Sequence, residues 1–141
     1  MNILFVCRAN RFRSKSSESL FLKYNKNQNI KVKSAGIRRD TFNPYVTPGL
    51  IKILKERGAN VTNEDSIQLD QNLVDWADKI IISANNVPLD LFPKEKTEVW
   101  DINDVDVDDP RPDIPGKMKK SIDKIEKHVK ILVKELKNIK K

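Results

Sequence analysis

The chain has 141 residues, of which 38% are hydrophobic and 33% charged, and its formal net charge is +7. This length predicts one domain over residues 1–141, and the apolar residues gather in periodic segments, which argues against disorder. No apolar stretch approaches the length of a membrane span and the N-terminus lacks a signal pattern, so we expect a cytoplasmic protein without membrane contact.

Much of the positive charge lies in residues 117–141, where lysines recur on the polar side of an expected helix. A nucleic-acid binder is the alternative that such a charge suggests, but a solvated helix face explains the lysines more simply. We therefore expect no nucleic-acid partner, and a monomer or weak dimer. The single cysteine, Cys7, excludes an internal disulfide, which is typical of a reducing compartment.

Strand and helix patterns alternate along the chain. In order, they are a buried strand over residues 1–6, a helix over 14–26, a strand over 30–34, an amphipathic helix over 49–57, a short helix over 70–77, a buried strand over 79–83, a strand over 98–102 and a long helix from 116 with an apolar stripe up to Ile139. Ser14 is the expected capping residue of the first helix, and Gly58 the end of the second. The alternation predicts an α/β fold in three layers, α/β/α, with ligands bound beyond the carboxyl ends of parallel strands.

The segment between the first strand and the first helix, residues 7–14, is here called the Cys7 loop. It contains Cys7, then Arg13 and directly after it Ser14. Backbone N–H groups of such a loop and the start of the next helix converge on one point, where they favour an anion and the thiolate form of a cysteine. A buried structural role is common for a lone cysteine, but this spacing favours Cys7 as a nucleophile and Arg13 as a clamp on phosphoryl oxygens. The remaining candidate phosphate-binding residues are Arg8, Ala9, Asn10, Arg11, Phe12 and Ser14.

This pattern resembles the low-molecular-weight protein tyrosine phosphatase family, whose signature is a cysteine, five residues, an arginine and a serine at the first strand–helix junction. Asn10, Glu18 and the triplet at 34–36 match as well. The resemblance implies a four-stranded parallel sheet of order 2-1-3-4 and a supporting role for Ser34 beneath the loop. It also implies metal-independent hydrolysis of phosphomonoesters, chiefly phosphotyrosine in proteins, through a cysteinyl-phosphate intermediate. The implied substrates are phosphorylated proteins or small phosphomonoesters, and no cofactor is expected.

Departure of a basic leaving group needs a proton, and the segment after the fourth strand supplies several carboxylates. The resemblance implies two candidates for the acid. Asp104 is the fourth residue after Trp100, as in many bacterial members, and Asp109 precedes a proline, as in the family at large. Asp104 is preferred, and Asp109 stays open. The same carboxylates do not match a calcium-binding loop, because Asp106 stands where glycine is required, so we expect no metal site.

Several residues depart from the family pattern. Ala9 stands where glycine is usual, Phe12 replaces a second cysteine, and Lys15 replaces a proline. No tyrosine follows the candidate acids, so Phe42 and Tyr45 are the expected aromatic face for substrate. One alternative is a phosphate-binding regulatory module of the same fold with little or no turnover. A less favoured one is an arsenate reductase, because thioredoxin-linked members need further cysteines for their disulfide relay.

Overall fold

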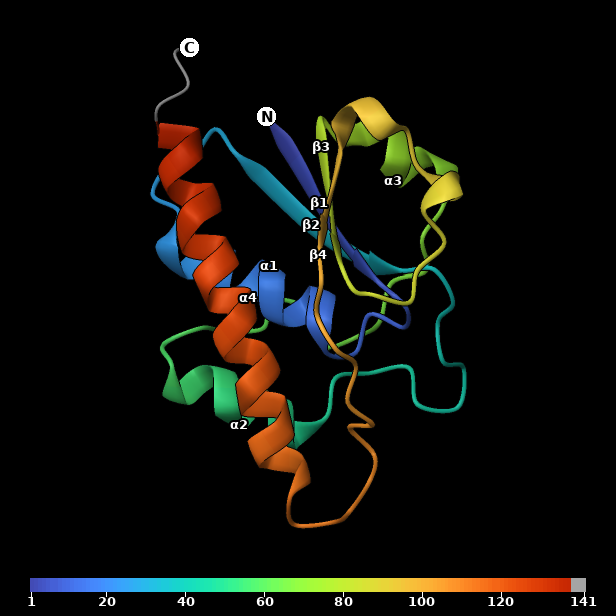
Figure 1. Ribbon diagram of the computed structural model, residues 1–141, viewed down its shortest axis with the longest axis vertical. Helices are drawn as coiled ribbons and strands as arrows, with labels where there is room; N and C mark the ends of the chain where they lie inside the picture. The colour runs from blue at the N-terminus through green and yellow to red at the C-terminus, as the bar shows by residue number, and fades with distance from the viewer. Residues whose placement is uncertain (138–141) are drawn as a thin grey trace.

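The computed structural model describes residues 1–137, and Figure 1 shows its strands and helices. In chain order these are β1 (Asn2–Cys7), α1 (Arg13–Tyr24), β2 (Lys31–Gly36), α2 (Pro48–Glu56), α3 (Gln71–Trp76), β3 (Lys79–Ser83), the short 3₁₀ turns η1 (Leu89–Leu91) and η2 (Lys94–Lys96), β4 (Thr97–Trp100) and α4 (Ile114–Lys137).

The four strands form one parallel sheet in the order β2-β1-β3-β4, which confirms the predicted fold class and strand order. β1 is a central strand, and its last residue, Cys7, pairs in register with Gly36 at the end of β2. Because all strands run the same way, the segments that follow β1, β2, β3 and β4 meet at one edge of the sheet. That edge holds the Cys7 loop.

The two faces of the sheet are covered by different helices. Alternate residues of β1 point to opposite faces, as the period of a strand requires. Ile3 and Phe5 belong to the cluster that includes residues of α1, α2 and α4, whereas Leu4 and Val6 pack with residues around α3. Figure 1 shows α1, α2 and α4 together on one side and α3 on the other.

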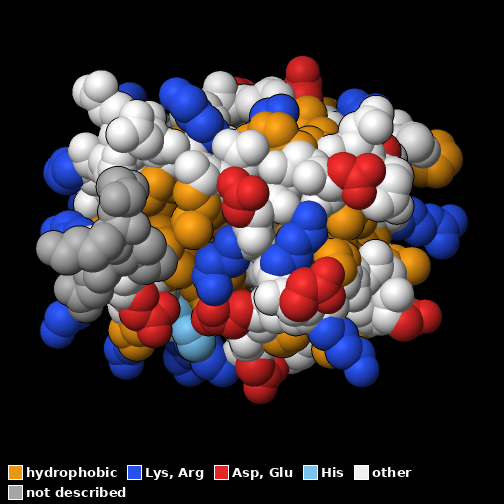
Figure 2. Space-filling model, turned by 90° about the horizontal axis from the view of Figure 1, so that it is seen from above, with side chains coloured by type: hydrophobic (Ala, Val, Ile, Leu, Met, Phe, Trp, Pro, Cys, Tyr) orange, Lys and Arg blue, Asp and Glu red, His pale blue; other side chains and the backbone are white. Residues whose placement is uncertain are grey.

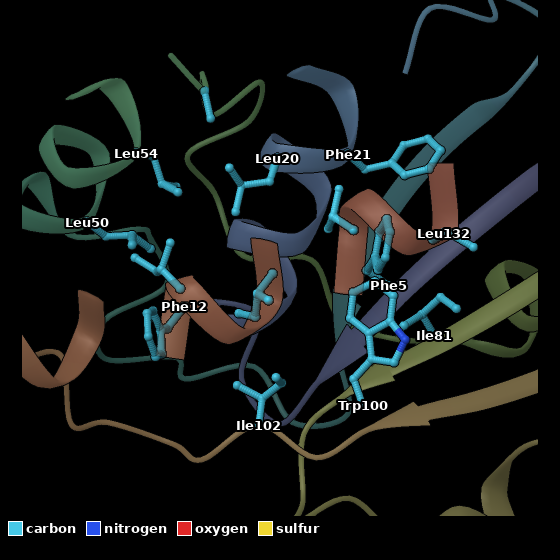
Figure 3. Packing of buried hydrophobic residues seen from close by; sticks show 14 of the residues in the cluster. Phe5, Phe12, Leu20, Phe21, Leu50, Leu54, Ile81, Trp100, Ile102 and Leu132 are labelled. Atoms are coloured by element: carbon cyan, nitrogen blue, oxygen red, sulfur yellow. The ribbon is translucent and has the colours of Figure 1, made fainter. Parts of the chain in front are cut away.

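The larger cluster is organised around aromatic rings. The ring of Phe5 lies 5.9 Å from that of Phe21 and 5.7 Å from that of Trp100, so β1, α1 and β4 meet at one point (Figure 3). α4 closes this cluster with the apolar stripe that the sequence predicted. Its buried members include Met118, Ile122, Ile125, Val129, Leu132 and Leu136. Ile139, the last residue of the predicted stripe, lies outside the described residues.

The lysines of α4 lie on its solvent side. On the face seen from above in Figure 2, Lys and Arg side chains lie among Asp and Glu side chains and do not form one continuous basic patch. Within residues 1–137, no helix combines the length and apolar character that crossing a membrane requires. In the same range, no three His, Cys, Asp or Glu side chains gather as metal ligands do.

The first helix differs from its prediction at its start. α1 begins at Arg13, and Phe12 occupies the N-cap position without a side-chain capping hydrogen bond. The prediction that Ser14 caps this helix is therefore wrong. The Oγ of Ser14 lies 3.0 Å from the Sγ of Cys7, so the hydroxyl serves the loop instead of a free amide of the helix.

The ends of the next two helices agree with ordinary capping chemistry. Thr47 caps α2 by accepting a hydrogen bond from the amide of Leu50, and Gly58 follows the helix with a φ of 78°, in the left-handed region that glycine tolerates. Asp70 caps α3 in the same way, through the amide of Leu73. These contacts confirm Gly58 as the end of α2.

Candidate active site

Asn10 lies at the centre of the Cys7 loop. Its φ is 59°, and among residues 1–137 it is the only non-glycine residue with a positive φ, a conformation that asparagine adopts more readily than most residues. Its backbone N–H donates to Cys7 Sγ over 3.3 Å. Its Oδ1 accepts from the amide of Ile67 at 2.9 Å, and because a backbone N–H can only donate, this contact fixes the orientation of the side-chain amide.

A chain of hydrogen bonds continues from Asn10 to the cysteine. The Nδ2 of Asn10 donates to Ser14 Oγ at 2.7 Å and to Ser34 Oγ at 3.0 Å. The hydroxyl of Ser34 donates in turn to Oε1 of Glu18 at 2.6 Å. Ser14 accepts from the amide, so its own proton is free to point at Cys7 Sγ, 3.0 Å away. A donor at that distance stabilises a thiolate.

Arg13 is held at the carboxyl edge by groups from two other segments. Its side chain is 1% exposed, one Nη donates to the carbonyl oxygen of Ile102 at 2.9 Å, and the other donates to Oδ1 of Asn86 at 2.9 Å. The second Nη also lies 3.2 Å from Oδ2 of Asp104. Sequence reasoning missed Asn86 and Ile102. The available signal was that they follow β3 and β4, whose carboxyl ends lie at the same edge of the sheet as that of β1.

A cavity of about 330 Å³ lies over the Cys7 loop. Three segments line it: the loop itself, the segment after β2, and residues 101–113 between β4 and α4, here called the acidic loop. The lining residues are Cys7, Ala9, Arg11, Phe12, Arg13, Asp40, Asp104, Val105, Asp106, Val107 and Asp108. The structure therefore brings Cys7, Arg13 and Asp104 to one cavity.

Other predicted site residues lie outside the lining of this cavity. The side chain of Arg8 is exposed, and its backbone carbonyl accepts from the amide of Arg38. Asn10, Ser14 and Ser34 are buried and contact one another beneath the cavity. These three residues therefore shape the loop through their side chains and do not line the space where a ligand fits.

The backbone of the Cys7 loop approaches Gly36 of β2 closely at Ala9. A Cβ placed on Gly36 would lie 2.6 Å from the carbonyl carbon of Ala9 and 2.7 Å from the amide nitrogen of Asn10, distances that real Cβ atoms do not show. The positive φ of the loop falls on Asn10 and not on Ala9. An alanine at this position is thus compatible with the observed loop, whose close approach to β2 depends on Gly36.

The two candidate acids differ in their surroundings. Asp104 lines the cavity beside Arg13 and its side chain is 48% exposed. Asp109 does not line the cavity, and Arg111 donates to both of its carboxylate oxygens. These hydrogen bonds lower the pKa of Asp109, which favours its ionised form and disfavours donation of a proton. Of the two aspartates, only Asp104 faces the space above Cys7.

The predicted aromatic face is not part of this cavity. Neither Phe42 nor Tyr45 lines it, and the side chain of Phe42 is 92% exposed. The backbone carbonyl of Tyr45 accepts from Nε of Arg11, whose guanidinium lies 5.9 Å from the tyrosine ring. Apolar contact is available instead from Val105 and Val107 of the acidic loop.

Two titratable side chains lie behind the Cys7 loop on α1. Lys15 is 1% exposed and donates to the carbonyl of Asn63 at 2.7 Å. Burial lowers the pKa of Lys15 and raises the pKa of Glu18, and in Glu18 the hydrogen bond from Ser34 and the charge of Lys15 oppose that rise. Glu18 is thus a titrating group at the far end of the hydrogen bonds that lead to the cysteine.

Comparison with known proteins shows which family the sequence resembles. The family described as low molecular weight phosphotyrosine protein phosphatase matches residues 2–141. Arsenate reductase 2 of Staphylococcus haemolyticus is 30% identical over 106 residues, which are 72% of this chain and 76% of that protein.

Solved structures agree over nearly the whole chain. A YwlE arginine phosphatase with a phosphorylated active-site serine is 26% identical, with a TM-score of 0.78 over 98% of this chain and 97% of that one. The arsenate reductase of Archaeoglobus fulgidus is 27% identical, with a TM-score of 0.69 over 93% and 98% of the two chains. The chain belongs to the low molecular weight phosphotyrosine protein phosphatase family and is a cysteine-based phosphatase.

Proposed function

We propose that the chain hydrolyses phosphoryl groups through a covalent intermediate on Cys7. The observation that carries this proposal is that Cys7, Arg13 and Asp104 line one cavity, with the Asn10 amide donating to the cysteine sulfur. Attack of the thiolate on phosphorus forms an S–P bond and breaks the P–O bond to the leaving group. The loop amides and the Arg13 guanidinium stabilise the charge of the phosphoryl oxygens in the transition state.

Asp104 acts first as general acid and then as general base. Its protonated carboxyl gives a proton to the leaving oxygen, which departs as an alcohol or phenol. The resulting carboxylate then accepts a proton from water as the water oxygen attacks phosphorus. The S–P bond breaks, inorganic phosphate leaves, and the thiolate of Cys7 is restored. These steps use groups of this chain and need no metal ion.

Phosphotyrosine in proteins is the substrate class we favour. The family is described by this activity, and Phe12, Val105 and Val107 give the cavity apolar walls against which an aryl ring can pack. A phenol leaving group has a pKa of about 10, so its departure gains from proton donation by Asp104.

Phosphoarginine in proteins is a second candidate, favoured by the charge around the cavity. Asp40 and Asp106 line it in addition to Asp104, and carboxylates at this position complement a leaving group that carries positive charge. A similar structure is that of a YwlE arginine phosphatase. The two substrates are distinguished by kcat/KM on a phosphotyrosine peptide and on a phosphoarginine peptide. If Asp40 recognises the positive charge of phosphoarginine, Asp40→Asn lowers kcat/KM only for the phosphoarginine peptide.

Arsenate reduction is a third candidate because the chain is similar to arsenate reductases. The sequence contains one cysteine, so a disulfide within the chain cannot form and each turnover would need an external thiol. Arsenate-dependent oxidation of glutathione or thioredoxin measures this activity.

A module that binds phosphate without turnover would instead show phosphate affinity and no hydrolysis.

The test of the leading proposal is turnover of phenyl phosphate in the presence of a chelator. The wild-type protein is expected to hydrolyse it and to form a phosphoenzyme that rapid alkaline quenching traps, whereas Cys7→Ala should do neither and still bind inorganic phosphate. Hydrolysis by Cys7→Ala, or loss of wild-type activity on chelation, would contradict the mechanism.

A further inference from the structure

Arg11 projects from the Cys7 loop and binds two other segments. Its two Nη atoms donate to the two carboxylate oxygens of Asp108 at 2.5 and 2.9 Å, and its Nε donates to the carbonyl oxygen of Tyr45 at 2.8 Å. The guanidinium therefore joins the Cys7 loop, the segment after β2 and the acidic loop. These are the three segments that line the cavity.

The contact with Asp108 has the geometry of a strong ion pair. Two parallel N–H···O bonds to one carboxylate give fixed orientation as well as attraction, and the side chain of Arg11 is only 6% exposed, against 43% for that of Asp108. Removing the carboxylate would leave a buried guanidinium charge without its partner, which is costly. The pair is therefore expected to hold its arrangement, unlike an exposed surface pair.

Local structure presents Asp108 to this arginine. The carbonyl of Asp106 accepts from the amide of Asp109 at 3.1 Å, and its Oδ1 accepts from the amide of Asp108 at 3.1 Å, so this part of the acidic loop is a turn. Asp104 precedes the turn in the same loop. Clamping Asp108 thus restrains the segment that carries the candidate acid.

We propose that Arg11 and Asp108 are positioning residues for the general acid: their ion pair holds the acidic loop over Cys7 so that Asp104 reaches the leaving group. This inference rests on the proposed function, in which Asp104 is the acid. In this arrangement three of the five N–H donors of Arg11 bind Tyr45 and Asp108, so its guanidinium is oriented by these two residues. In the proposed function Arg13 is the residue that clamps the phosphoryl oxygens.

Dependence on the leaving group tests this role. A phenyl phosphate needs the acid, since its phenol has a pKa of about 10, whereas p-nitrophenyl phosphate has a much less basic leaving group and needs it far less. Misplacing the acid in Asp108→Asn should lower kcat/KM roughly tenfold to a hundredfold for phenyl phosphate and much less for p-nitrophenyl phosphate. Asp101→Asn, which removes an exposed carboxylate of the same loop outside the cavity, is the control and should leave both values unchanged.

Two further variants separate this inference from the assignment of the acid. Arg11→Lys keeps the charge but not the planar fork, and should reproduce the selective loss of Asp108→Asn. In an Asp104→Asn background, Asp108→Asn should have no further effect on either substrate. Thermal unfolding of each variant shows that the fold is retained.

The outcomes separate as follows. An equal loss for both substrates in Asp108→Asn, or a loss that adds to that of Asp104→Asn, overturns the positioning role and leaves the proposed function standing. A normal ratio of the two substrates in Asp104→Asn overturns the acid assignment, and the positioning role with it. A selective loss that disappears in the double variant supports both.

Discussion

The hydroxyl of Ser14 lies 3.0 Å from Cys7 Sγ, and because it accepts a hydrogen bond from the side-chain amide of Asn10, its own proton is free to donate to the sulfur. Asn10 supplies both of its Nδ2 protons to serine hydroxyls, and its orientation is fixed by the amide of Ile67. A backbone contact on another segment therefore determines which Asn10 atom faces the hydroxyl of Ser14. The hydrogen bonds around Cys7 therefore depend on residues that do not line the cavity.

Replacing Ser14 by alanine is expected to slow the enzyme. A hydrogen bond to a charged group contributes about 1.5–3 kcal/mol, which corresponds to a loss of roughly tenfold to a hundredfold in the rate of phosphoenzyme formation. Alkylation of Cys7 by iodoacetamide at fixed pH should slow as well, because the attacking sulfur loses this hydrogen-bond donor. Stopped-flow bursts and alkylation rates measure the two effects.

Ser16→Ala is the matched control for Ser14→Ala. Ser16 is on the same helix and fully buried, and within residues 1–137 its Oγ has no hydrogen-bond partner. Removing a buried hydroxyl without a partner is expected to leave the rates unchanged and to raise the free energy of unfolding by about 1 kcal/mol. Equal rate losses in the two variants would show that the effect of Ser14 is structural.

Asp104→Asn and Asp109→Asn should give different pH profiles. Asp104 lines the cavity beside Arg13, whereas Asp109 is bound to Arg111 and kept ionised. Loss of a positioned acid costs roughly a hundredfold or more, so Asp104→Asn should lose the basic limb of the kcat/KM profile on phenyl phosphate. Asp109→Asn should keep it. The opposite pattern would assign the acid to Asp109.

Sequence alone located the Cys7 loop because its placement depends on a local pattern. A strand, a short loop and a helix in succession put Cys7 at the carboxyl edge of the sheet, however the rest of the chain is packed. The spacing from Cys7 to Arg13 completes the pattern. The acid could not be chosen in this way. The acidic loop has no periodicity, and the contact of Asp104 with Arg13 joins residues that are distant in the chain.

Residues that act over long sequence separation were missed for the same reason. Asn86 and Asp108 bind arginines of the Cys7 loop, and the only sequence signal for these roles is that both residues follow strands of the sheet. The error at Ser14 has a different origin. A serine before a helical pattern favours capping, but here the loop enters α1 at Arg13, and the serine hydroxyl turns to the sulfur.

Gly36→Ala should damage the site although Gly36 does not line the cavity. A Cβ at this position would meet backbone atoms of Ala9 and Asn10 at 2.6 and 2.7 Å, so the Cys7 loop or the end of β2 has to shift. Overpacking of this kind costs about 1–3 kcal/mol, and the shift moves the amide that donates to Cys7. The free energy of unfolding, measured in urea, and the affinity for phosphate should both fall.

Gly116→Ala is the control for Gly36→Ala. Gly116 is in α4, and a Cβ there meets no atom within 4 Å. Alanine restricts the unfolded chain more than glycine does, so this variant should gain about 0.4–1 kcal/mol in stability and keep its phosphate affinity. If Gly36→Ala also kept its affinity, the close approach of the loop to β2 would not be needed for binding.

Glu18 should make the stability of the protein fall as pH rises. Burial raises its pKa in the folded state, so above the ordinary glutamate pKa the folded chain holds a proton that the unfolded chain has lost. Stability then decreases with pH until the raised pKa is passed, and is flat beyond it. Lys15, whose pKa burial lowers, acts in the opposite sense, because below the ordinary lysine pKa the unfolded chain holds a proton that the folded chain has lost.

Glu18→Gln removes this titration and keeps an oxygen that can accept from Ser34. Above the ordinary glutamate pKa of about 4, its free energy of unfolding is expected to change less with pH than that of the wild type, so the variant gains relative to the wild type as pH rises. Urea unfolding at several pH values measures the difference. Glu95→Gln, which removes an exposed carboxyl on η2, should follow the wild type. Parallel curves for wild type and Glu18→Gln would mean that Glu18 titrates alike in the folded and unfolded chains, and that its buried contact with Ser34 offsets the cost of its charge.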